Sequence, residues 1–275
     1  MVKMIIVDID GTILHKNKIH SRTIEAVQYA KSLNIPFVIA TGRNITTIKP
    51  IAEKLGVFNE GHYFIGQNGG QVFKYLKNGE FCIEYTDVLD NEVAKIIFKK
   101  AKANKIKVFA YSEYEKHAYC TNKMGAFTTF MKFKSKRQKL LSIKQIDQNS
   151  AISKCVCFGN SKNMKNFRSS IDELNLSIFD FSYVSNAHAN IEINPPGVNK
   201  AKGIKFICDD MKIDPKDVIY FGDGDNDIAA LEFVGHGVAM INAKTKVKSH
   251  AKYITDLPVQ EGGVGEYLFK NIFEK

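Results

Sequence analysis

Asp8-Ile9-Asp10-Gly11-Thr12 is the stretch that decides the fold. Just before it runs Met4-Ile5-Ile6-Val7, a short apolar segment that predicts a buried parallel strand ending at Asp8. Open α/β sheets bind ligands at the carboxyl ends of their strands. Alternate residues of an extended chain point the same way, so both carboxylates are expected to face one site. Asp-Gly is also a common turn pair, but this position directly after a strand favours a site for a hard cation and a phosphoryl group.

The composition is that of a folded chain. It has 275 residues, enough for one large domain or two smaller ones, and 44% of them are hydrophobic. No apolar run approaches the ~18 residues of a membrane span. The first strand begins almost at once, which leaves no room for a signal peptide. Five scattered cysteines do not suggest a disulfide framework. We therefore expect a soluble, cytoplasmic protein without a membrane partner.

The net charge of +10 is distributed unevenly. Residues 84–188 hold 18 Lys and Arg against 10 Asp and Glu, a net charge of +8, whereas the remainder holds 21 against 19. The densest basic cluster comprises Lys132, Lys134, Lys136, Arg137 and Lys139. Such charge can attract nucleic acid or a small anionic substrate. Because no nucleic-acid-binding motif accompanies it, we interpret the cluster as a solvated surface and expect no specific nucleic-acid partner.

Strands and helices alternate at the two ends of the chain. Apolar runs at 37–40 and 63–65 predict two more buried strands, and a helix capped by Ser21 and a helix at 46–55 precede them. This order is typical of a parallel sheet with right-handed crossovers. The alternation returns later, with a buried strand at 218–221. The sequence therefore predicts an α/β core, a Rossmann-like doubly wound parallel sheet.

The middle of the chain follows a different pattern. A helix fits 91–103 and several strands surround it, without a phosphate loop or an acidic pair, while 124–150 fits no clear pattern. These features predict an inserted α+β domain. We expect this domain to comprise residues 84–188, and the core to comprise residues 1–83 and 189–275.

Four segments at strand ends or helix starts carry polar groups. The first is the Asp-Ile-Asp-Gly-Thr stretch, and the second is Thr41 with the open backbone N–H of Gly42. The third is Lys200 at the start of a helix. The fourth, Gly222–Asp227, lacks the spacing and the terminal Glu of an EF-hand calcium loop. Taken singly, Thr-Gly is usually a turn and a lysine is usually at the surface. Their joint occurrence in this order predicts one site.

Together these segments resemble the haloacid dehalogenase superfamily of phosphotransferases, in particular its Cof-type branch of sugar-phosphatase-like proteins with a class IIB cap. The resemblance covers nearly the whole chain and rests on the following motifs: Asp8–Thr12, Ala40–Arg43, Asn68–Gly70, Glu192-Ile193, Lys200, Gly222–Asp227 and Glu261–Val264. That branch carries a large α+β cap where this chain has its inserted domain. Ala201 stands where the family commonly has Gly after the lysine.

The resemblance implies catalytic and metal-binding roles for three aspartates. Asp8 would be the nucleophile that forms an aspartyl phosphate. Asp10 would act as general acid and then as general base. The Asp8 and Asp223 carboxylates and the Asp10 backbone carbonyl would hold Mg²⁺, an ion that suits oxygen ligands.

The resemblance also implies a phosphate-binding set. Thr41, the Gly42 N–H and Lys200 would bind phosphoryl oxygens and spread the charge that develops on them. Asn226 would hydrogen-bond the phosphate or orient Lys200. Asp227 would support these residues from outside the metal site.

The implied activity is that of a Mg²⁺-dependent phosphatase of small phosphorylated metabolites, with sugar phosphates, nucleotides and pyridoxal phosphate as candidate substrates. The inserted domain at 84–188 would select among them. A phosphomutase or a phosphonate hydrolase on the same core is an alternative that the position and size of this domain disfavour. A regulatory protein that binds a phosphorylated metabolite with little turnover is an alternative of another class, disfavoured because a sensor needs no nucleophile. The sequence does not indicate the oligomeric state.

Overall fold

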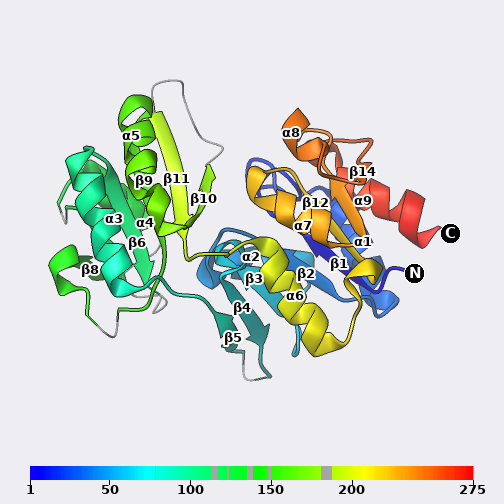
Figure 1. Cartoon of the computed structure of the whole chain (residues 1–275). Helices are drawn as coiled ribbons and strands as arrows, with labels where there is room; N and C mark the ends of the chain where they lie inside the picture. Colours follow the sequence, from blue (N-terminus) through cyan, green and yellow to red (C-terminus); the bar gives the residue numbers. More distant parts are fainter. Residues whose placement is uncertain are drawn as a thin grey trace. The chain divides into compact units, whose positions relative to one another are not determined.

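A computed structural model describes residues 1–77, 79–112, 117–122, 124–134, 139–147, 150–180 and 188–274. The chain divides into two compact units, whose elements are labelled in Figure 1. Met1–Thr86 and Asn199–Lys275 form the first unit, and Asp87–Val198 form the second.

The first unit is built on a mainly parallel sheet. Its strands lie in the order β14-β13-β12-β1-β2-β3-β4-β5, with β4 and β5 antiparallel to their neighbours. The strands are β1 Met4–Val7, β2 Phe37–Ala40, β3 Tyr63–Gly66, β4 Gln71–Tyr75, β5 Phe81–Thr86, β12 Val218–Gly222, β13 His236–Ala239 and β14 Tyr253–Ile254. The chain runs outward from β1 on one side and resumes at β12 on the other. This arrangement makes the boundary of β1 and β12 the switch point of a doubly wound sheet.

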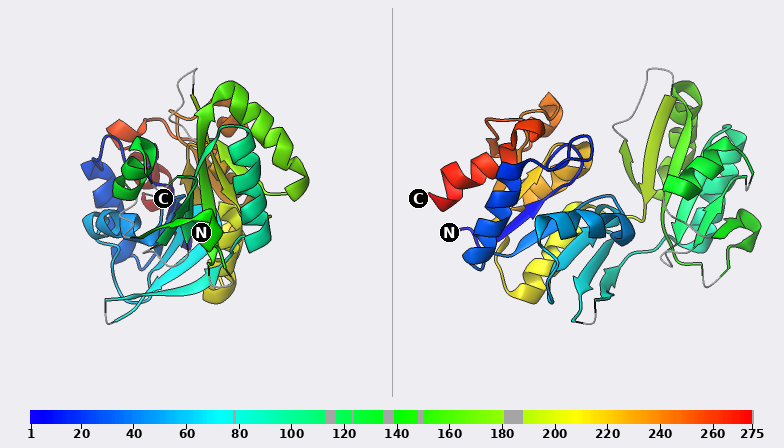
Figure 2. Two further views of the ribbon diagram at one scale, coloured as in Figure 1. Left: turned by 90° about the vertical axis from the view of Figure 1, so that its left-hand side faces the viewer. Right: turned by 180° about the vertical axis from the view of Figure 1, so that it is seen from behind.

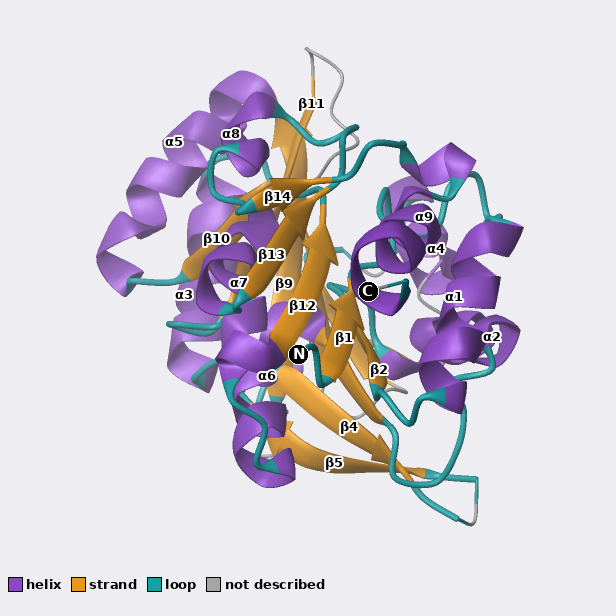
Figure 3. Cartoon of the chain, turned by 90° about the vertical axis from the view of Figure 1, so that its right-hand side faces the viewer, coloured by secondary structure: helices purple, strands orange, loops and turns teal. Residues whose placement is uncertain are grey.

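Helices cover both faces of this sheet (Figure 3). They are α1 Ser21–Ser32, α2 Ile45–Leu55, α6 Lys200–Met211, α7 Ile228–Phe233, α8 Thr245–Lys248 and α9 Gly263–Leu268. Helices α1, α2 and α9 pack on the face to which Ile5 and Val7 of β1 belong. Helices α6, α7 and α8 pack on the face of Met4 and Ile6. Since side chains alternate between the faces of a strand, a strand covered on both faces must be apolar throughout, as β1 is.

The second unit is built on a mainly antiparallel sheet with the strand order β10-β11-β9-β6-β7-β8. Its strands are β6 Lys107–Ser112, β7 His117–Cys120, β8 Lys139–Ser142, β9 Ile152–Asn160, β10 Ser177–Asp180 and β11 His188–Asn194, and its helices are α3 Asn91–Ala103, α4 Ala126–Lys134 and α5 Ser161–Ile171. Helices α3 and α5 pack on one face of the sheet. Helix α4 packs on the other face through Phe127 and Met131 (Figure 2).

Two local expectations differ from the structure, and one segment carried no expectation. The cap of α1 is His20 rather than Ser21, because the His20 ring nitrogen Nδ1 accepts a hydrogen bond from the Arg22 N–H at 3.2 Å. The segment 124–150, which fitted no pattern, contains helix α4 and strand β8. The second unit ends at Val198 rather than at residue 188, because β11 pairs with β9 and β10 inside its sheet.

The predicted fold class is confirmed: a doubly wound α/β core carries an inserted α+β unit. Within the part of the chain that the structure describes, every helix is too short or too polar to cross a lipid bilayer. Lys132 of the basic cluster lies on α4, and Lys139 begins β8. Lys136 and Arg137, and the side chain of Lys134, lie outside the described residues.

Candidate active site

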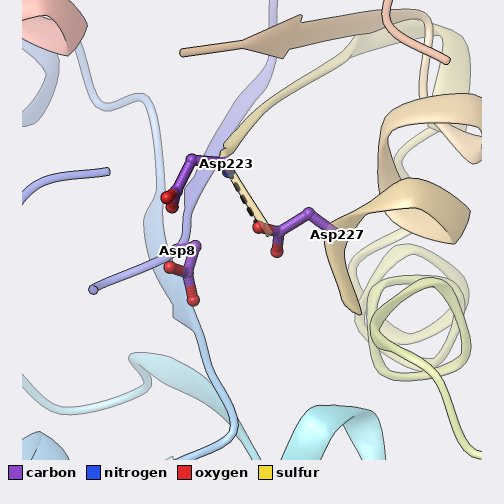
Figure 4. A group of neighbouring side chains, drawn as sticks. All are labelled: Asp8, Asp223 and Asp227. Atoms are coloured by element: carbon purple, nitrogen blue, oxygen red, sulfur yellow. Dashed lines mark hydrogen bonds between the residues drawn. The ribbon is translucent and has the colours of Figure 1, made fainter. Parts of the chain in front are cut away.

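The carboxyl ends of β1 and β12 bring three aspartates together. The two strands pair in parallel, with Val7 beside Phe221, so Asp8 and the segment after β12 emerge at the same edge of the sheet. Carboxylate oxygens of Asp8, Asp223 and Asp227 all lie within 4.8 Å of one another (Figure 4). Strand ends thus place an acidic group where open α/β sheets bind their ligands.

Two glycines allow the carboxylates to lie this close to the backbone. Gly11 has a φ of +88°, and a Cβ there would overlap the Asp223 carboxylate. A Cβ at Gly222 would overlap the Asp227 carboxylate. Any side chain at either position would displace an aspartate, which explains the glycines physically.

Lys200 places a buried cation between two of the carboxylates. It is the first residue of α6 and is 0% exposed. Its Nζ donates to Asp8 Oδ1 and to Asp227 Oδ1, each at 2.6 Å. Burial by itself lowers the pKa of Lys200, but the Asp227 and Asp8 carboxylates outweigh burial and raise this pKa above its usual range. Lys200 therefore stays charged at neutral pH.

Asp227 is enclosed by hydrogen-bond donors. Besides the bond from Lys200, its Oδ1 accepts from the Tyr220 hydroxyl at 2.5 Å. Its Oδ2 accepts from the backbone N–H groups of Asp223 at 2.9 Å and of Gly224 at 2.8 Å, the first of which is drawn dashed in Figure 4. A carboxylate offers about four acceptor positions. Asp227 is thus engaged in fixing Lys200 and its own loop.

The acidic group carries an excess of negative charge. Burial raises the pKa of Asp8, Lys200 opposes this rise, and Asp227 and Asp223 add to it. Burial and Asp227 raise the pKa of Asp223 to about 7, against a hydrogen bond from Thr12 and the charge of Lys200. A divalent cation would offset this charge, and carboxylate oxygens are the donors that hard cations prefer. The residues present therefore fit such an ion, which Asp8 and Asp223 would hold.

Asp10 has a different partner. Its half-exposed carboxylate accepts two hydrogen bonds from Arg43, from Nε to Oδ2 at 2.7 Å and from Nη2 to Oδ1 at 2.5 Å. This bidentate geometry is the strong form of an arginine–carboxylate contact. No role was predicted for Arg43 from the sequence, because its contact with Asp10 depends on how side chains from two separate loops meet.

The remaining predicted residues lie at the same edge of the sheet. Thr41 directly follows β2, the neighbour of β1, and its Oγ1 accepts from the Arg43 N–H at 3.3 Å. Gly42 lies between these two residues and is half-buried. Asn226 lies in the loop after β12, and its Nδ2 donates to Asn68 Oδ1 at 2.9 Å. Direct contacts thus join Asp8, Lys200, Asp223 and Asp227, whereas the side chains of Asp10 and Asn226 contact Arg43 and Asn68.

Several supporting residues escaped the sequence analysis. Thr12 Oγ1 donates to Asp223 Oδ1 at 2.9 Å, and Thr12 was visible inside the first motif. Asn242 Nδ2 donates to the Gly11 carbonyl oxygen at 2.9 Å and so braces the same loop. The role of Tyr220 was not predictable, because an aromatic residue in an apolar strand is usually part of the core.

Comparisons with known proteins identify the family and the fold of the chain. The family of haloacid dehalogenase-like hydrolases matches residues 5–268. The 5-amino-6-(5-phospho-D-ribitylamino)uracil phosphatase YcsE of Bacillus subtilis is 24% identical, over 95% of this chain and 92% of that protein. A solved structure of a haloacid dehalogenase-like hydrolase from Bacteroides thetaiotaomicron is 27% identical, covers 98% of this chain and 99% of that one, and has a TM-score of 0.79.

A second solved structure, the subclass IIB sugar phosphatase BT4131, shares the fold, with a TM-score of 0.78, 24% identity and 98% coverage of both chains. The expected resemblance is therefore confirmed over nearly the full length of the sequence. The chain belongs to the haloacid dehalogenase-like hydrolases and is a phosphatase of that family.

Proposed function

We propose that the chain is a Mg²⁺-dependent phosphatase that hydrolyses sugar phosphates or similar small phosphomonoesters through an aspartyl phosphate on Asp8. The observation that carries the proposal is the group of buried Asp8, buried Lys200 and half-buried Asp223 at the carboxyl edge of the sheet. Phosphoryl transfer depends on the positioning of a nucleophile and on positive charge around the phosphate. This group supplies a carboxylate nucleophile, a lysine and ligands for a cation.

The Asp8 and Asp223 carboxylates, with the Asp10 backbone carbonyl, would hold the metal. When bound, Mg²⁺ supplies positive charge that offsets the repulsion between these carboxylates and the phosphate. Asp227 keeps Lys200 in place, since its oxygens are engaged by Lys200, Tyr220 and two backbone N–H groups.

In the first step, an Asp8 oxygen forms a bond to phosphorus while the bond between phosphorus and the ester oxygen breaks. Asp10 gives a proton to the departing oxygen. For this transfer Asp10 leaves Arg43, because that guanidinium engages both of its oxygens in this structure. Lys200 and Thr41 bind the phosphoryl oxygens and stabilise the charge that develops there.

In the second step, a water molecule attacks the phosphorus of the aspartyl phosphate. Asp10, now ionised, takes the proton of this water, and the bond between phosphorus and the Asp8 oxygen breaks. Inorganic phosphate leaves and Asp8 is restored. The Gly42 N–H and the Asn226 amide serve as further donors to the phosphoryl oxygens during both steps.

One observation supports a sugar-like or polyol-like group in the substrate, and a second supports a phosphorylated anion. The name of YcsE places its phosphate on a ribitylamino group. The second unit, residues 87–198, holds 18 Lys and Arg against 10 Asp and Glu, a net charge of +8, which favours phosphorylated anions. We therefore assign substrate selection to the second unit.

Release of inorganic phosphate from p-nitrophenyl phosphate and from a panel of phosphorylated sugars tests the proposal. We expect release with Mg²⁺, none with a chelator, and a loss on the order of 10⁴-fold or more in Asp8→Asn. An Asp8→Asn protein that retains metal-dependent turnover would contradict the role of Asp8. Binding of these compounds without any release would favour the regulatory alternative.

A further inference from the structure

The turn after β3 contacts two of the proposed phosphate-binding residues, yet the reaction steps above do not use it. Gln67, Asn68 and Gly69 have successive φ angles of +52°, +58° and +97°. Left-handed backbone is unfavourable for residues other than glycine. Two such residues in a row persist only where their surroundings hold them, and such segments cluster at functional sites.

Hydrogen bonds tie this turn to the segment after β2. The Gln67 N–H donates to the Arg43 carbonyl oxygen at 3.0 Å, and the Asn68 N–H donates to the Thr41 carbonyl oxygen at 3.0 Å. The turn is therefore fastened to the backbone of the segment that carries Thr41.

Asn68 reaches one phosphate-binding residue through its side chain. It is 0% exposed, and its Oδ1 accepts from Asn226 Nδ2 at 2.9 Å. A side-chain amide nitrogen carries two hydrogens. The bond to Asn68 engages one of them and fixes the amide plane, so the other hydrogen can point to a phosphoryl oxygen.

Gly69 contacts the second phosphate-binding residue, Lys200, through its backbone. A Cβ at Gly69 would overlap the Asn199 carbonyl oxygen and would lie 3.0 Å from Lys200 Cα. The Lys200 ammonium is held by Asp8 and Asp227. Since the side chain is held at its far end, the contact with Gly69 fixes the other end, where α6 begins.

We infer that Gln67–Gly69 is a positioning element of the phosphate site. Asn68 orients the Asn226 amide, and Gly69 sets the distance of the Lys200 backbone from the sheet edge. The inference rests on the proposed function, because Asn226 and Lys200 are phosphate-binding residues only in that proposal. The turn itself makes no contact with the reacting atoms.

A double-mutant cycle tests the part played by Asn68. Asn68→Gly removes the side-chain amide, and glycine adopts the left-handed backbone conformation of this position without strain. We expect it to lower kcat/KM for p-nitrophenyl phosphate with Mg²⁺ by about tenfold, the worth of one hydrogen bond. In an Asn226→Ala background the same change should matter by about twofold or less, because its target is gone. Equal losses in both backgrounds would overturn the inference.

Gly69→Ala tests the contact with α6, with Gly61→Ala as its matched control. Gly61 also has a left-handed φ, +85°, but a Cβ there would meet nothing within 4 Å. Both substitutions strain the backbone, while only the first displaces Lys200. We expect kcat to fall by about 100-fold in Gly69→Ala, the typical result of a misplaced catalytic group, and to stay near the native value in Gly61→Ala.

Thermal unfolding of both variants shows whether each is folded. A folded Gly69→Ala protein with native kcat would overturn the inference, and if this variant does not fold, the Asn68 cycle decides. Failure of the proposed function is recognised separately. It would appear as turnover that survives in Asp8→Asn while residues 67–69 are unchanged.

Discussion

Each unit of the chain buries a lysine against a carboxylate, but the two lysines differ in charge balance. In the second unit, Lys154 is 6% exposed at its side chain, and its Nζ donates to Glu192 Oε1 at 2.7 Å. In the first unit, Lys200 lies between Asp8 and Asp227. The contact in the second unit joins one positive charge to one negative charge, whereas in the first unit one positive charge lies beside a group of three carboxylates.

The difference separates a structural pair from a functional site. The attraction within a balanced buried pair is largely offset by the desolvation of its two ions. An unbalanced group keeps negative charge that folding does not neutralise, and burial then raises the pKa of a member such as Asp223 to about 7. Perturbed groups of this kind concentrate at functional sites. Charge balance, rather than burial, therefore distinguishes Lys200 from Lys154.

Of the substitutions in the two units, Lys200→Met should have the largest effect on stability and on turnover. It leaves Asp8 and Asp227 buried without their cation, so the free energy of unfolding should fall by about 3–5 kcal/mol. It also removes a phosphate ligand, so kcat should fall by about 10³-fold. Denaturant unfolding and phosphate release measure the two losses. A variant that keeps native turnover would show that Lys200 is structural, as Lys154 is.

Lys154→Met should lower the free energy of unfolding by about 3 kcal/mol, because Glu192 stays buried and loses the Lys154 ammonium. Adding Glu192→Leu should return the protein to within about 1 kcal/mol of the native stability, since it removes the buried carboxylate that Lys154→Met leaves behind. Denaturant unfolding compares the two variants. A double variant as unstable as the single one would show that the ion pair itself stabilises the second unit.

Mg²⁺ should raise the free energy of unfolding through the acidic group, by about 2.7 kcal/mol at a concentration 100 times its Kd. Asp223→Asn should abolish this gain, because it removes a proposed metal ligand. Glu192→Gln, in the balanced pair, should leave the gain intact. Unfolding at a series of Mg²⁺ concentrations measures it. Stabilisation that survives Asp223→Asn would locate the ion elsewhere.

Tyr220→Phe and Tyr119→Phe form the smallest and most closely matched test. The Tyr220 hydroxyl donates to Asp227 Oδ1, and the Tyr119 hydroxyl of the second unit donates to Ser150 Oγ at 2.7 Å. Each change should cost about 1 kcal/mol of unfolding free energy, the usual net value of a hydrogen bond. Only Tyr220→Phe should lower kcat, because only Tyr220 supports the residue that holds Lys200. Equal kcat values in the two variants would show that Tyr220 does not support the position of Lys200 during catalysis.

The sequence predicted the parts of the molecule that follow from strand ends. Asp8, Thr41 and Asp223 each follow a short apolar run, and parallel strands bring such ends to one edge. The bond of Arg43 to Asp10 and the bond of Asn68 to Asn226 were not predictable, because they depend on how side chains from separate loops meet.

The extent of the second unit was a harder problem for the same reason. β11 alternates apolar and polar residues, as many strands do, and this pattern does not tell which sheet the strand joins. Helix α4 and strand β8 lie in a lysine-rich segment whose apolar residues show no clear period. Tertiary packing decides the structure there, and local propensity does not.

The central position of β1 also has a consequence for biosynthesis. β1 is made long before its neighbour β12, which begins only at Val218, after the whole second unit. At roughly 5–20 residues per second, a growing chain needs on the order of ten to forty seconds to reach it. During that time one edge of β1 lacks its native strand, a state that favours pairing with other chains. The acidic group cannot assemble before β12 docks, so the proposed catalytic centre forms only after the whole second unit has been made.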